Sequence, residues 1–308
     1  MLPSDLYSQP NAADPVLDER TVLNIVRRHV GSCSVVTSID ETGGEARAYG
    51  IDANLVLKVQ RPHRQRPRTS LAKEAFFLHQ LASYPDIVVP HVLGYGRHET
   101  IEYLVMTQMQ GVSALTVELT GAQRTHVLHQ LGRTLRRLHS IPQAPFYGSA
   151  LFPGNRTQEE FIERVRATLA YAVQVIGATP NLWQLDVAPA DLASRALAAL
   201  PASVDLVALH SNPGPVHTFV QPDTLEFVGL IDFGDAYISH PALDWRWPTH
   251  ADRVALLHGY CGETPATDEF MAAWRSTLVF SDMSALATRP ETRPQTLERL
   301  RDLLITFT

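Results

Sequence analysis

Apolar and polar positions along the chain follow two different periods. Up to about residue 110, short apolar runs separated by turn residues predict strands. The expected strands cover residues 34–39, 45–51, 55–59 and 100–107. Beyond residue 120, apolar residues recur every three or four positions, as on one face of a helix. The expected helices cover 127–139, 159–176, 191–200, 251–260, 268–280 and 296–305, with two earlier ones at 19–30 and 69–83.

This change of period predicts an α+β fold of two lobes. A β-rich amino lobe would cover residues 20–110, and a mainly helical carboxyl lobe would cover residues 111–308. The polar sequence at 108–111 interrupts the apolar pattern and is interpreted as a hinge between the lobes. Residues 1–19 are polar and contain proline, which predicts a flexible lead-in. The Gly-Tyr-Gly sequence at 94–96 predicts a turn before the last strand of the amino lobe.

A hairpin expected over residues 209–244 carries most of the polar residues that favour chemistry. Apolar residues alternate over 216–220 and again over 225–231, with Gln221-Pro222-Asp223 as the turn between them. Strand register fixes the separation of side chains, so such a hairpin can hold metal-binding groups close together. An ordinary solvent-facing hairpin is the alternative interpretation. The polar residues are His210, Asn212 and His217 before the turn, and Asp232 and Asp235 after it.

Lys58 interrupts the apolar run Leu55–Val59 of the third expected strand. A buried ammonium group needs a carboxylate partner or a bound anion to offset the loss of water. Glu74 lies close to the apolar stripe of the helix at 69–83, so it could face the sheet. The pattern predicts a Lys58–Glu74 ion pair whose ammonium is directed at a phosphate. The alternative is a lysine at a strand edge that extends to water.

The composition is that of a globular protein and argues against several classes. The 308 residues are 45% hydrophobic and 19% charged, and the net charge of −6 argues against a nucleic-acid-binding protein. No apolar run approaches the roughly 20 residues that span a bilayer, so no membrane partner is expected. The amino terminus lacks a signal-peptide pattern and Cys33 and Cys261 make no disulfide framework, so we expect a cytoplasmic protein. The one basic cluster, at 61–68, is interpreted as a solvated loop rather than an anion site.

Several short motifs occur along the chain in a definite order. They are V-L-K-V around Lys58, A-K-E-A around Glu74, Y-L-V-M-T-Q-M-Q-G at 103–111, L-G-R-T-L-R-R-L-H-S at 131–140, H-S-N-P-G-P-V-H at 210–217, I-D-F-G-D-A at 231–236 and P-A-L-D at 241–244. Together they resemble the aminoglycoside and macrolide phosphotransferases, the antibiotic-kinase branch of the protein-kinase-like fold. The resemblance covers roughly residues 20–280 and rests on the order and spacing of the motifs rather than on any one of them.

The resemblance implies a bilobal protein-kinase-like fold that uses ATP or GTP as phosphoryl donor. Lys58 would hold the α- and β-phosphates, and Glu74 would orient Lys58. The turn at Gly43-Gly44 would cover the phosphates, although it lacks the fuller glycine-rich pattern of protein kinases. Backbone groups at Gln108 and Met109 would bind the purine edge.

The resemblance also implies a magnesium site and a braced catalytic loop. Asp232 would bind Mg²⁺ that bridges the phosphates. His217 occupies the position where many relatives have Asn as the second metal ligand, and an imidazole is softer than Mg²⁺ prefers. His210 and Asp244 would brace the catalytic loop. Asp235 would either assist the metal or shape the hairpin.

Asn212 departs from the family pattern, because the family loop reads H-G-D with the aspartate as catalytic base. An amide can hydrogen-bond a hydroxyl but cannot take its proton, and the following Pro213 biases Asn212 toward extended geometry. The chain could be a phosphotransferase whose base lies elsewhere or is dispensable. It could also be an engineered variant, a pseudokinase that acts through a protein partner, or a scaffold for other nucleotide-driven chemistry. The favoured function is transfer of the γ-phosphoryl group to a hydroxyl of a small molecule, an antibiotic or a pathway intermediate.

The acceptor would bind to helices of the carboxyl lobe. In relatives, the helices that correspond to residues 145–190 and the carboxyl-terminal helices build the acceptor pocket. Asp186 and Glu263 are the candidates for gripping an amine of the acceptor. Trp245 and Trp247 could stack on a substrate ring, although such residues more often pack the lobe.

Overall fold

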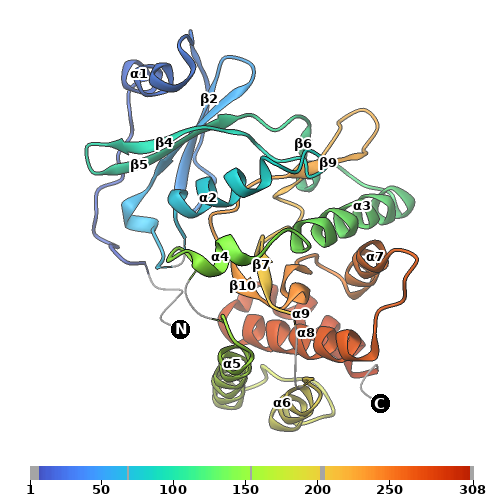
Figure 1. Ribbon diagram of the computed structural model, residues 1–308. Helices are drawn as coiled ribbons and strands as arrows, with labels where there is room; N and C mark the ends of the chain where they lie inside the picture. Colours follow the sequence, from blue (N-terminus) through green and yellow to red (C-terminus); the bar gives the residue numbers. More distant parts are fainter. Residues whose placement is uncertain (1–6, 68, 153–154, 202–204, 306–308) are drawn as a thin grey trace. The chain divides into compact units, whose positions relative to one another are not determined.

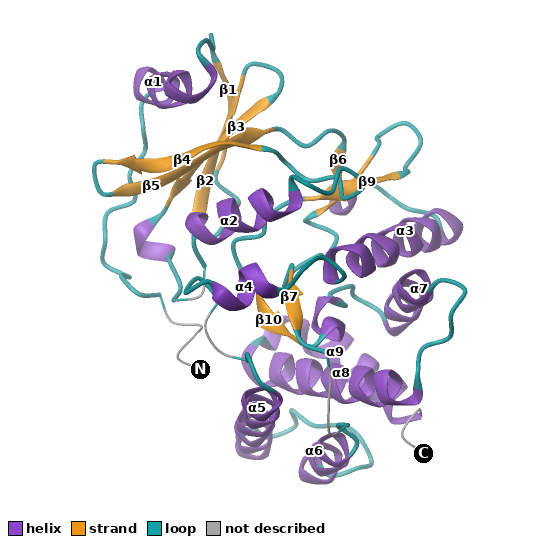
Figure 2. Cartoon of the chain, in the orientation of Figure 1, coloured by secondary structure: helices purple, strands orange, loops and turns teal. Residues whose placement is uncertain are grey.

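The computed structural model describes residues 7–67, 69–152, 155–201 and 205–305 (Figure 1). Contacts between residues divide the chain into two compact units. The first unit comprises residues 1–118 and 215–236, and the second comprises residues 119–214 and 237–308. The first unit therefore contains residues 215–236 of the expected hairpin, whereas the sequence pattern assigns them to the helical carboxyl lobe. Figure 2 shows that strands dominate the first unit and helices the second.

The first unit is built on a five-stranded sheet in the order β1-β2-β3-β5-β4. Neighbouring strands in this sheet are antiparallel. Two helices and a smaller sheet, β6-β8-β9, complete the unit. The elements are α1 (Glu19–Val30), β1 (Val36–Asp40), β2 (Ala46–Ile51), β3 (Leu55–Gln60), α2 (Leu71–Leu81), β4 (Val92–His98), β5 (Ile101–Thr107), β6 (Val112–Ser113), β8 (Thr218–Val220) and β9 (Phe227–Leu230), with short 3-10 turns at Pro62–Arg64 and Ala114–Thr116.

The two faces of the large sheet are covered by different helices. On one face, buried residues of α1 form a core with Tyr49, Leu57 and Val105. Side chains alternate along a strand, so Lys58 points to the opposite face from Leu57. That opposite face receives α2, which contacts β4 and β5. The alternation thus directs the one lysine of β3 toward a helix that carries a carboxylate.

The helix boundaries in this unit follow the capping signals. Asp18 precedes α1, and its carboxylate accepts a hydrogen bond from the backbone N–H of Thr21 at 2.7 Å. Gly31 ends the helix with a φ of 81°, a left-handed conformation that favours glycine. Ser70 caps α2 in the same way through the N–H of Lys73 at 3.0 Å. The predicted range 19–30 for the first helix is confirmed, and the second is two residues shorter at each end than predicted.

The turn predicted at Gly94-Tyr95-Gly96 is wrong, because these residues lie inside strand β4. Both glycines are required by close packing rather than by a turn. A Cβ on Gly94 would come within 2.1 Å of the His29 ring, and one on Gly96 would come within 2.8 Å of the Tyr103 hydroxyl. His29 and Tyr103 also contact each other, with 3.0 Å between Nε2 and the hydroxyl oxygen. Glycine at both positions lets these side chains approach the strand.

The second unit consists mainly of helices, with a two-stranded sheet formed by β7 and β10. The helix that begins at Asp268, α8, is longer than predicted, because it continues to Thr288 instead of ending near residue 280. Asp282 interrupts the apolar pattern of the sequence just after residue 280, although its side chain is buried. The elements are α3 (Gly121–His139), α4 (Ala144–Gly148), α5 (Gln158–Ala178), α6 (Pro189–Ala198), β7 (Val207–Leu209), β10 (Tyr237–Ser239), α7 (His250–Cys261), α8 (Asp268–Thr288) and α9 (Arg293–Ile305), with short 3-10 turns at Pro241–Asp244 and Pro290–Thr292.

Ion pairs join the helices of the second unit. Asp282 on α8 accepts hydrogen bonds from Arg253 on α7 at 2.6 and 2.9 Å, and from Arg299 on α9 at 2.9 Å. Arg124 on α3 makes a two-pronged contact with Asp252 on α7, at 2.6 and 2.8 Å. A buried carboxylate with several charged donors is strongly held, and breaking such a set is costly. These contacts fix the positions of the carboxyl-terminal helices relative to one another.

Candidate functional site

Two carboxylates of the first unit contact the ammonium group of Lys58. Lys58 comes from β3, Glu74 from α2, and Asp232 from the segment that directly follows β9. The ammonium nitrogen donates to both carboxylate oxygens of Glu74, at 2.8 and 2.9 Å, and to Oδ1 of Asp232 at 2.7 Å. The predicted Lys58–Glu74 pair is therefore confirmed as a contact. Lys58 and Asp232, which are 174 positions apart in the sequence, share one site.

Burial and charge act in opposite directions on this cluster. The side chains of Lys58 and Glu74 are 12% and 1% exposed, whereas that of Asp232 is 41% exposed. Burial favours the neutral form of Lys58, but the carboxylates of Asp232 and Glu74 outweigh it and raise the pKa of Lys58 above its ordinary value. Burial raises the pKa of Glu74, and the Lys58 ammonium only partly opposes that rise. The cluster thus consists of a charged lysine, an enclosed carboxyl group and a carboxylate accessible to solvent.

The hairpin brings His217 beside Asp232. Strand β8 pairs with β9 so that Thr218 lies opposite Leu230, and the N–H of Ile231 donates to the carbonyl of His217 at 3.1 Å. This register places His217 Nε2 at 3.2 Å from Oδ2 of Asp232. Asp232 adopts a φ of 71°, an uncommon backbone conformation that Asp tolerates better than most residues. Such strained positions concentrate at functional sites.

The tip of the hairpin differs from the predicted pattern. Leu225 was expected to begin the second strand, but it has a φ of 58° and lies in the turn. The strand β9 begins at Phe227, which pairs with Val220 across a register shift. The turn therefore extends beyond Gln221-Pro222-Asp223, without changing the pairing at the end where His217 and Asp232 lie.

Glu45 and Arg66 add charges near Asp235 that the sequence pattern did not single out. Burial raises the pKa of Glu45, and the next largest contribution is the charge of Asp235, with a smaller one from Asp232. Arg66 opposes this rise, with its Nε at 3.0 Å from a carboxylate oxygen of Glu45. Asp235 itself accepts a hydrogen bond from the Thr69 hydroxyl. The position of Glu45 directly after Gly43-Gly44 was the only signal in the sequence that could have singled it out.

The expected purine-binding residues lie where β5 ends. The N–H of Gln108 donates to the carbonyl of Asn54 at 2.7 Å, so this donor is already used between the end of β5 and the start of β3. Met109 is buried, and its side chain lies near Gly229 of β9, where a Cβ would come within 3.1 Å of the methionine methyl group. The Gly43-Gly44 turn joins β1 to β2. The structure therefore places all the expected nucleotide-binding residues in the first unit.

The loop that contains Asn212 belongs to the second unit and is held by Asp244. The buried Asp244 carboxylate accepts from the N–H groups of His210 at 2.9 Å and Ser211 at 2.6 Å, and lies 3.0 Å from His139 Nε2. The N–H of Asn212 donates to Nδ1 of His210 at 3.2 Å, so a neutral His210 carries its proton on Nε2. Ser211 has a φ of 81°, in the left-handed region, and the following Asn212 is exposed.

The other candidates of the second unit divide into buried and exposed residues. Trp245 and Trp247 are 1% and 2% exposed, so they pack the interior and do not present a stacking surface. Trp247 also donates its indole N–H to the carbonyl of Pro213 at 3.0 Å, which supports the loop around Asn212. Asp186 and Glu263 are exposed. Their role toward an acceptor amine stays a prediction.

The donor atoms near Asp232 suit a minimal magnesium site. Within the described parts of the chain, no group of three or more His, Cys, Asp or Glu side chains is arranged to hold a metal ion. Mg²⁺ does not require such a cage, because it commonly uses one or two protein carboxylates together with phosphates and water. The partly exposed Asp232 carboxylate beside His217 meets that requirement.

None of the described helices is long and apolar enough to cross a membrane.

Solved structures define the class of the fold. The GDP complex of aminoglycoside 2′-phosphotransferase-IIIa aligns with a TM-score of 0.60 and 14% identity. The alignment covers 95% of this chain and 100% of that chain. The apoenzyme of a macrolide 2′-phosphotransferase from Brachybacterium faecium aligns with a TM-score of 0.58 and 22% identity over 91% and 97% of the two chains. An aminoglycoside-3′-phosphotransferase of type VIII gives 0.50 and 22% over 85% and 98%. The predicted α+β, kinase-like fold is confirmed.

The sequence itself identifies the family. Residues 11–274 match the profile of the phosphotransferase enzyme family. The match covers most of the chain, so this protein belongs to that family, as the ordered motifs predicted. A sequence search of curated proteins found no match.

Proposed function

We propose that the protein transfers the γ-phosphoryl group of ATP or GTP to a hydroxyl group of a small molecule. The observation that carries this proposal is the position of the Lys58 ammonium between the buried Glu74 and the partly exposed Asp232, at 2.8 and 2.7 Å. Phosphoryl transfer depends mainly on positioning and on charge stabilisation around the phosphates. A fixed ammonium beside a solvent-accessible carboxylate provides both.

In this proposal each member of the cluster has a separate task. Lys58 binds the α- and β-phosphates, and Glu74 holds the lysine through two hydrogen bonds. Asp232 and His217 would hold Mg²⁺, which neutralises phosphate charge when it is bound. Asp232 must exchange at least part of its contact with Lys58 for the metal, and its exposure makes that exchange possible. The backbone around Met109 binds the purine, and the Gly43-Gly44 turn covers the phosphates.

The chemical classes of donor and acceptor are taken from the structural neighbours. One neighbour was solved as a ternary complex with streptomycin and ATP, another with ADP and spectinomycin, and others with GDP. We propose a hydroxylated antibiotic or a similar natural product as the acceptor for this chain. Asp186 and Glu263 remain candidates for binding an acceptor amine.

Asn212 favours a second candidate function, a nucleotide-binding protein with little or no turnover. In the motif of the family, this position holds the aspartate that removes the proton of the attacking hydroxyl. The Asn212 amide can align that hydroxyl, but cannot accept its proton. General-base catalysis contributes about 10²–10⁴-fold to rate, so the proposed phosphotransferase would be slow but not inert. A pseudokinase with a protein partner would bind nucleotide without turnover.

The decisive experiment compares the wild-type protein with Asn212→Asp. Turnover of ATP and of GTP is measured with Mg²⁺ and a panel of aminoglycosides, macrolides and spectinomycin, and nucleotide affinity is measured separately. Asn181→Asp is the matched control, because it adds the same charge at another exposed asparagine of the second unit. A gain of about 10²–10⁴-fold in Asn212→Asp alone supports an impaired phosphotransferase. Nucleotide binding with no turnover in either protein, for any acceptor, supports the binding function instead.

A further inference from the structure

The segment before α1 is attached at several points to β2 and to the segment that follows β3. We call residues 7–18 the strap. At one end, the N–H of Ser8 donates to the carbonyl of Gln65 at 2.8 Å. At the other, the N–H of Leu17 donates to the Tyr49 hydroxyl of β2 at 3.0 Å. Residues 1–19 were predicted to be a flexible lead-in. The described part of this segment instead makes specific contacts with β2 and with the segment after β3.

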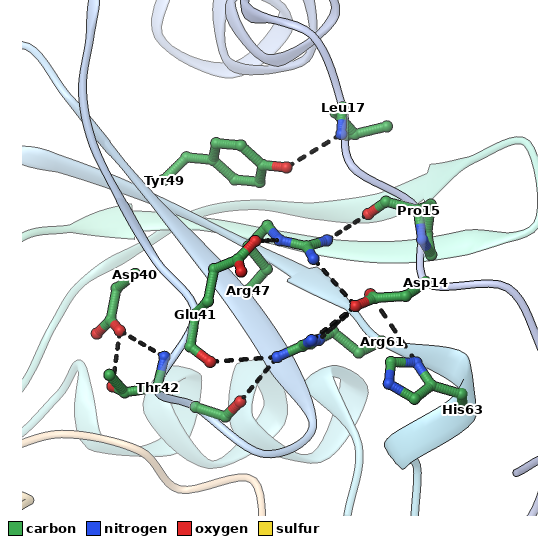
Figure 3. A network of polar contacts seen from close by, with 11 residues as sticks. Asp14, Pro15, Leu17, Asp40, Glu41, Thr42, Arg47, Tyr49, Arg61 and His63 are labelled. Carbon is green, nitrogen blue, oxygen red and sulfur yellow. Dashed lines mark hydrogen bonds and ion pairs between the residues drawn. The ribbon is translucent and has the colours of Figure 1, made fainter.

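Asp14 is the centre of these contacts (Figure 3). Its carboxylate lies 3.0 Å from Nη2 of Arg47 and 2.6 Å from Nη2 of Arg61. The arginine side chains are 2% and 6% exposed, so both guanidinium groups have lost most of their water. Arg47 donates in addition to the carbonyl of Pro15 at 2.5 Å. The strap thus supplies a carboxylate and a carbonyl to two buried cations, Arg47 in β2 and Arg61 directly after β3.

The same two arginines hold the turn between β1 and β2. Arg61 Nη1 donates to the carbonyl oxygens of Glu41 at 3.2 Å and Gly43 at 3.3 Å. Arg47 Nε donates to the Glu41 carboxylate at 2.7 Å. Figure 3 shows that the guanidinium groups lie between the strap and the turn. Among the residues that the structure describes, Asp14 is linked to the turn through the two guanidinium groups, which are planar and donate in fixed directions.

The charges of this network balance only when Asp14 is ionised. Two arginines face two carboxylates, those of Asp14 and Glu41. The hydrogen bond from Arg61 lowers the pKa of Asp14 more than burial raises it, so Asp14 is charged at neutral pH. Arg61 was expected to belong to a solvated basic loop, but it is buried because Asp14 and the turn carbonyls take up its donors. Glu41 is 56% exposed and contributes less, since water screens it.

We propose that the strap positions the Gly43-Gly44 turn, and that Asp14 acts on the turn through Arg61 and Arg47. Asp14 is a positioning residue, because it reaches the turn only through the arginines. The consequence for nucleotide binding rests on the proposed function, in which this turn covers the phosphates. A turn that is held in place before nucleotide arrives loses less conformational entropy on binding than a free one.

The first test measures the turn directly and needs no nucleotide. Hydrogen–deuterium exchange is followed in the full-length protein for peptides that cover residues 41–46 and, as an internal reference, β5. Asp14→Asn should raise exchange at 41–46 by about 10-fold or more, the size expected when a charge-assisted hydrogen bond is lost, and leave β5 unchanged. Asp18→Asn is the matched control: it removes the same charge from the strap, and Asn caps a helix as well as Asp does. It should change neither peptide.

The second test measures the effect on ligands that contain phosphates. Asp14→Asn should weaken the affinity for Mg²⁺–ATP or Mg²⁺–GTP by about 10-fold and leave the affinity for the nucleoside without phosphates unchanged. Asp14→Glu, which keeps the charge, should restore much of the lost affinity. A general structural defect would weaken both kinds of ligand equally and would not be corrected by Glu.

Each outcome decides the proposal. Raised exchange at 41–46 alone, with the selective loss of phosphate-containing ligands, supports it. Wild-type exchange in Asp14→Asn, or an equal rise in β5 because the unit loses stability as a whole, overturns it. If the wild-type protein binds no nucleotide, the proposed function fails, while the exchange experiment still decides whether Asp14 positions the turn.

Discussion

Replacing Lys58 with methionine removes the cation that compensates two carboxylates, and the loss can be followed as a function of pH. Glu74 is 1% exposed and would be left in the interior with neither its ammonium partner nor enough water. Removal of one partner of a buried ion pair costs about 3–5 kcal/mol when the remaining group stays charged. Glu74 can reduce this cost by taking up a proton, because burial already raises its pKa in the wild-type protein.

The sign of the pH dependence follows from that protonation. In Lys58→Met, the pKa of Glu74 is higher in the folded state than in the unfolded state. A group of this kind contributes its full stability below the unfolded pKa and loses it as pH rises through the folded pKa. The variant should therefore be close to the wild-type protein near pH 4.5 and lose most stability toward pH 8. Urea unfolding at several pH values, followed by circular dichroism, measures the difference.

A second substitution separates this explanation from a simple packing defect. When Lys58→Met is made in a protein that already carries Glu74→Gln, no buried carboxyl group can ionise at position 74. The stability lost relative to Glu74→Gln alone should therefore be the same at all pH values between about 5 and 8. Asp232 is too exposed to produce the effect, since water solvates its carboxylate. The reasoning would be refuted if Lys58→Met lost equal stability at pH 5 and pH 8, or if the double variant kept the pH dependence.

Three further predictions concern metal choice and the second unit. His217→Asn should shift the metal preference of nucleotide binding toward Mg²⁺ over Mn²⁺ by about 10-fold, because an amide oxygen is a harder ligand than an imidazole nitrogen. Nucleotide affinity is measured with each metal in turn. An unchanged ratio of the two affinities would exclude His217 as a ligand. Asp282→Asn should destabilise the protein by about 3–5 kcal/mol, because Arg253 and Arg299 lose a shared buried carboxylate; thermal unfolding measures it, and a loss under 1 kcal/mol would contradict the triad. Asp244→Asn should raise hydrogen exchange at residues 209–212 by about 10-fold without affecting the first unit, since the amide can accept from only one of the two loop N–H groups at full strength.

The local signals in the sequence were sufficient for most of the elements and for part of the site. The helix at 19–30 was predicted with its observed bounds, because apolar spacing depends only on neighbouring residues. The Lys58–Glu74 contact was also predicted, since a lysine inside an apolar strand needs a carboxylate and the next helix offers one. The hairpin pattern predicted only that polar groups at its edges could lie close together, and the structure places His217 beside Asp232.

The sequence by itself determined the alternation that turns Lys58 away from the α1 core, the helical faces of the second unit and the order of the motifs that identifies the family. Only the tertiary structure decided that Asp14 joins Arg47 to Arg61, that the glycines of β4 make room for His29 and Tyr103, and that α8 continues past the buried Asp282. The physical reason is the same in each case. A charge or a glycine has no periodic signature, and its meaning depends on which distant groups the fold places around it.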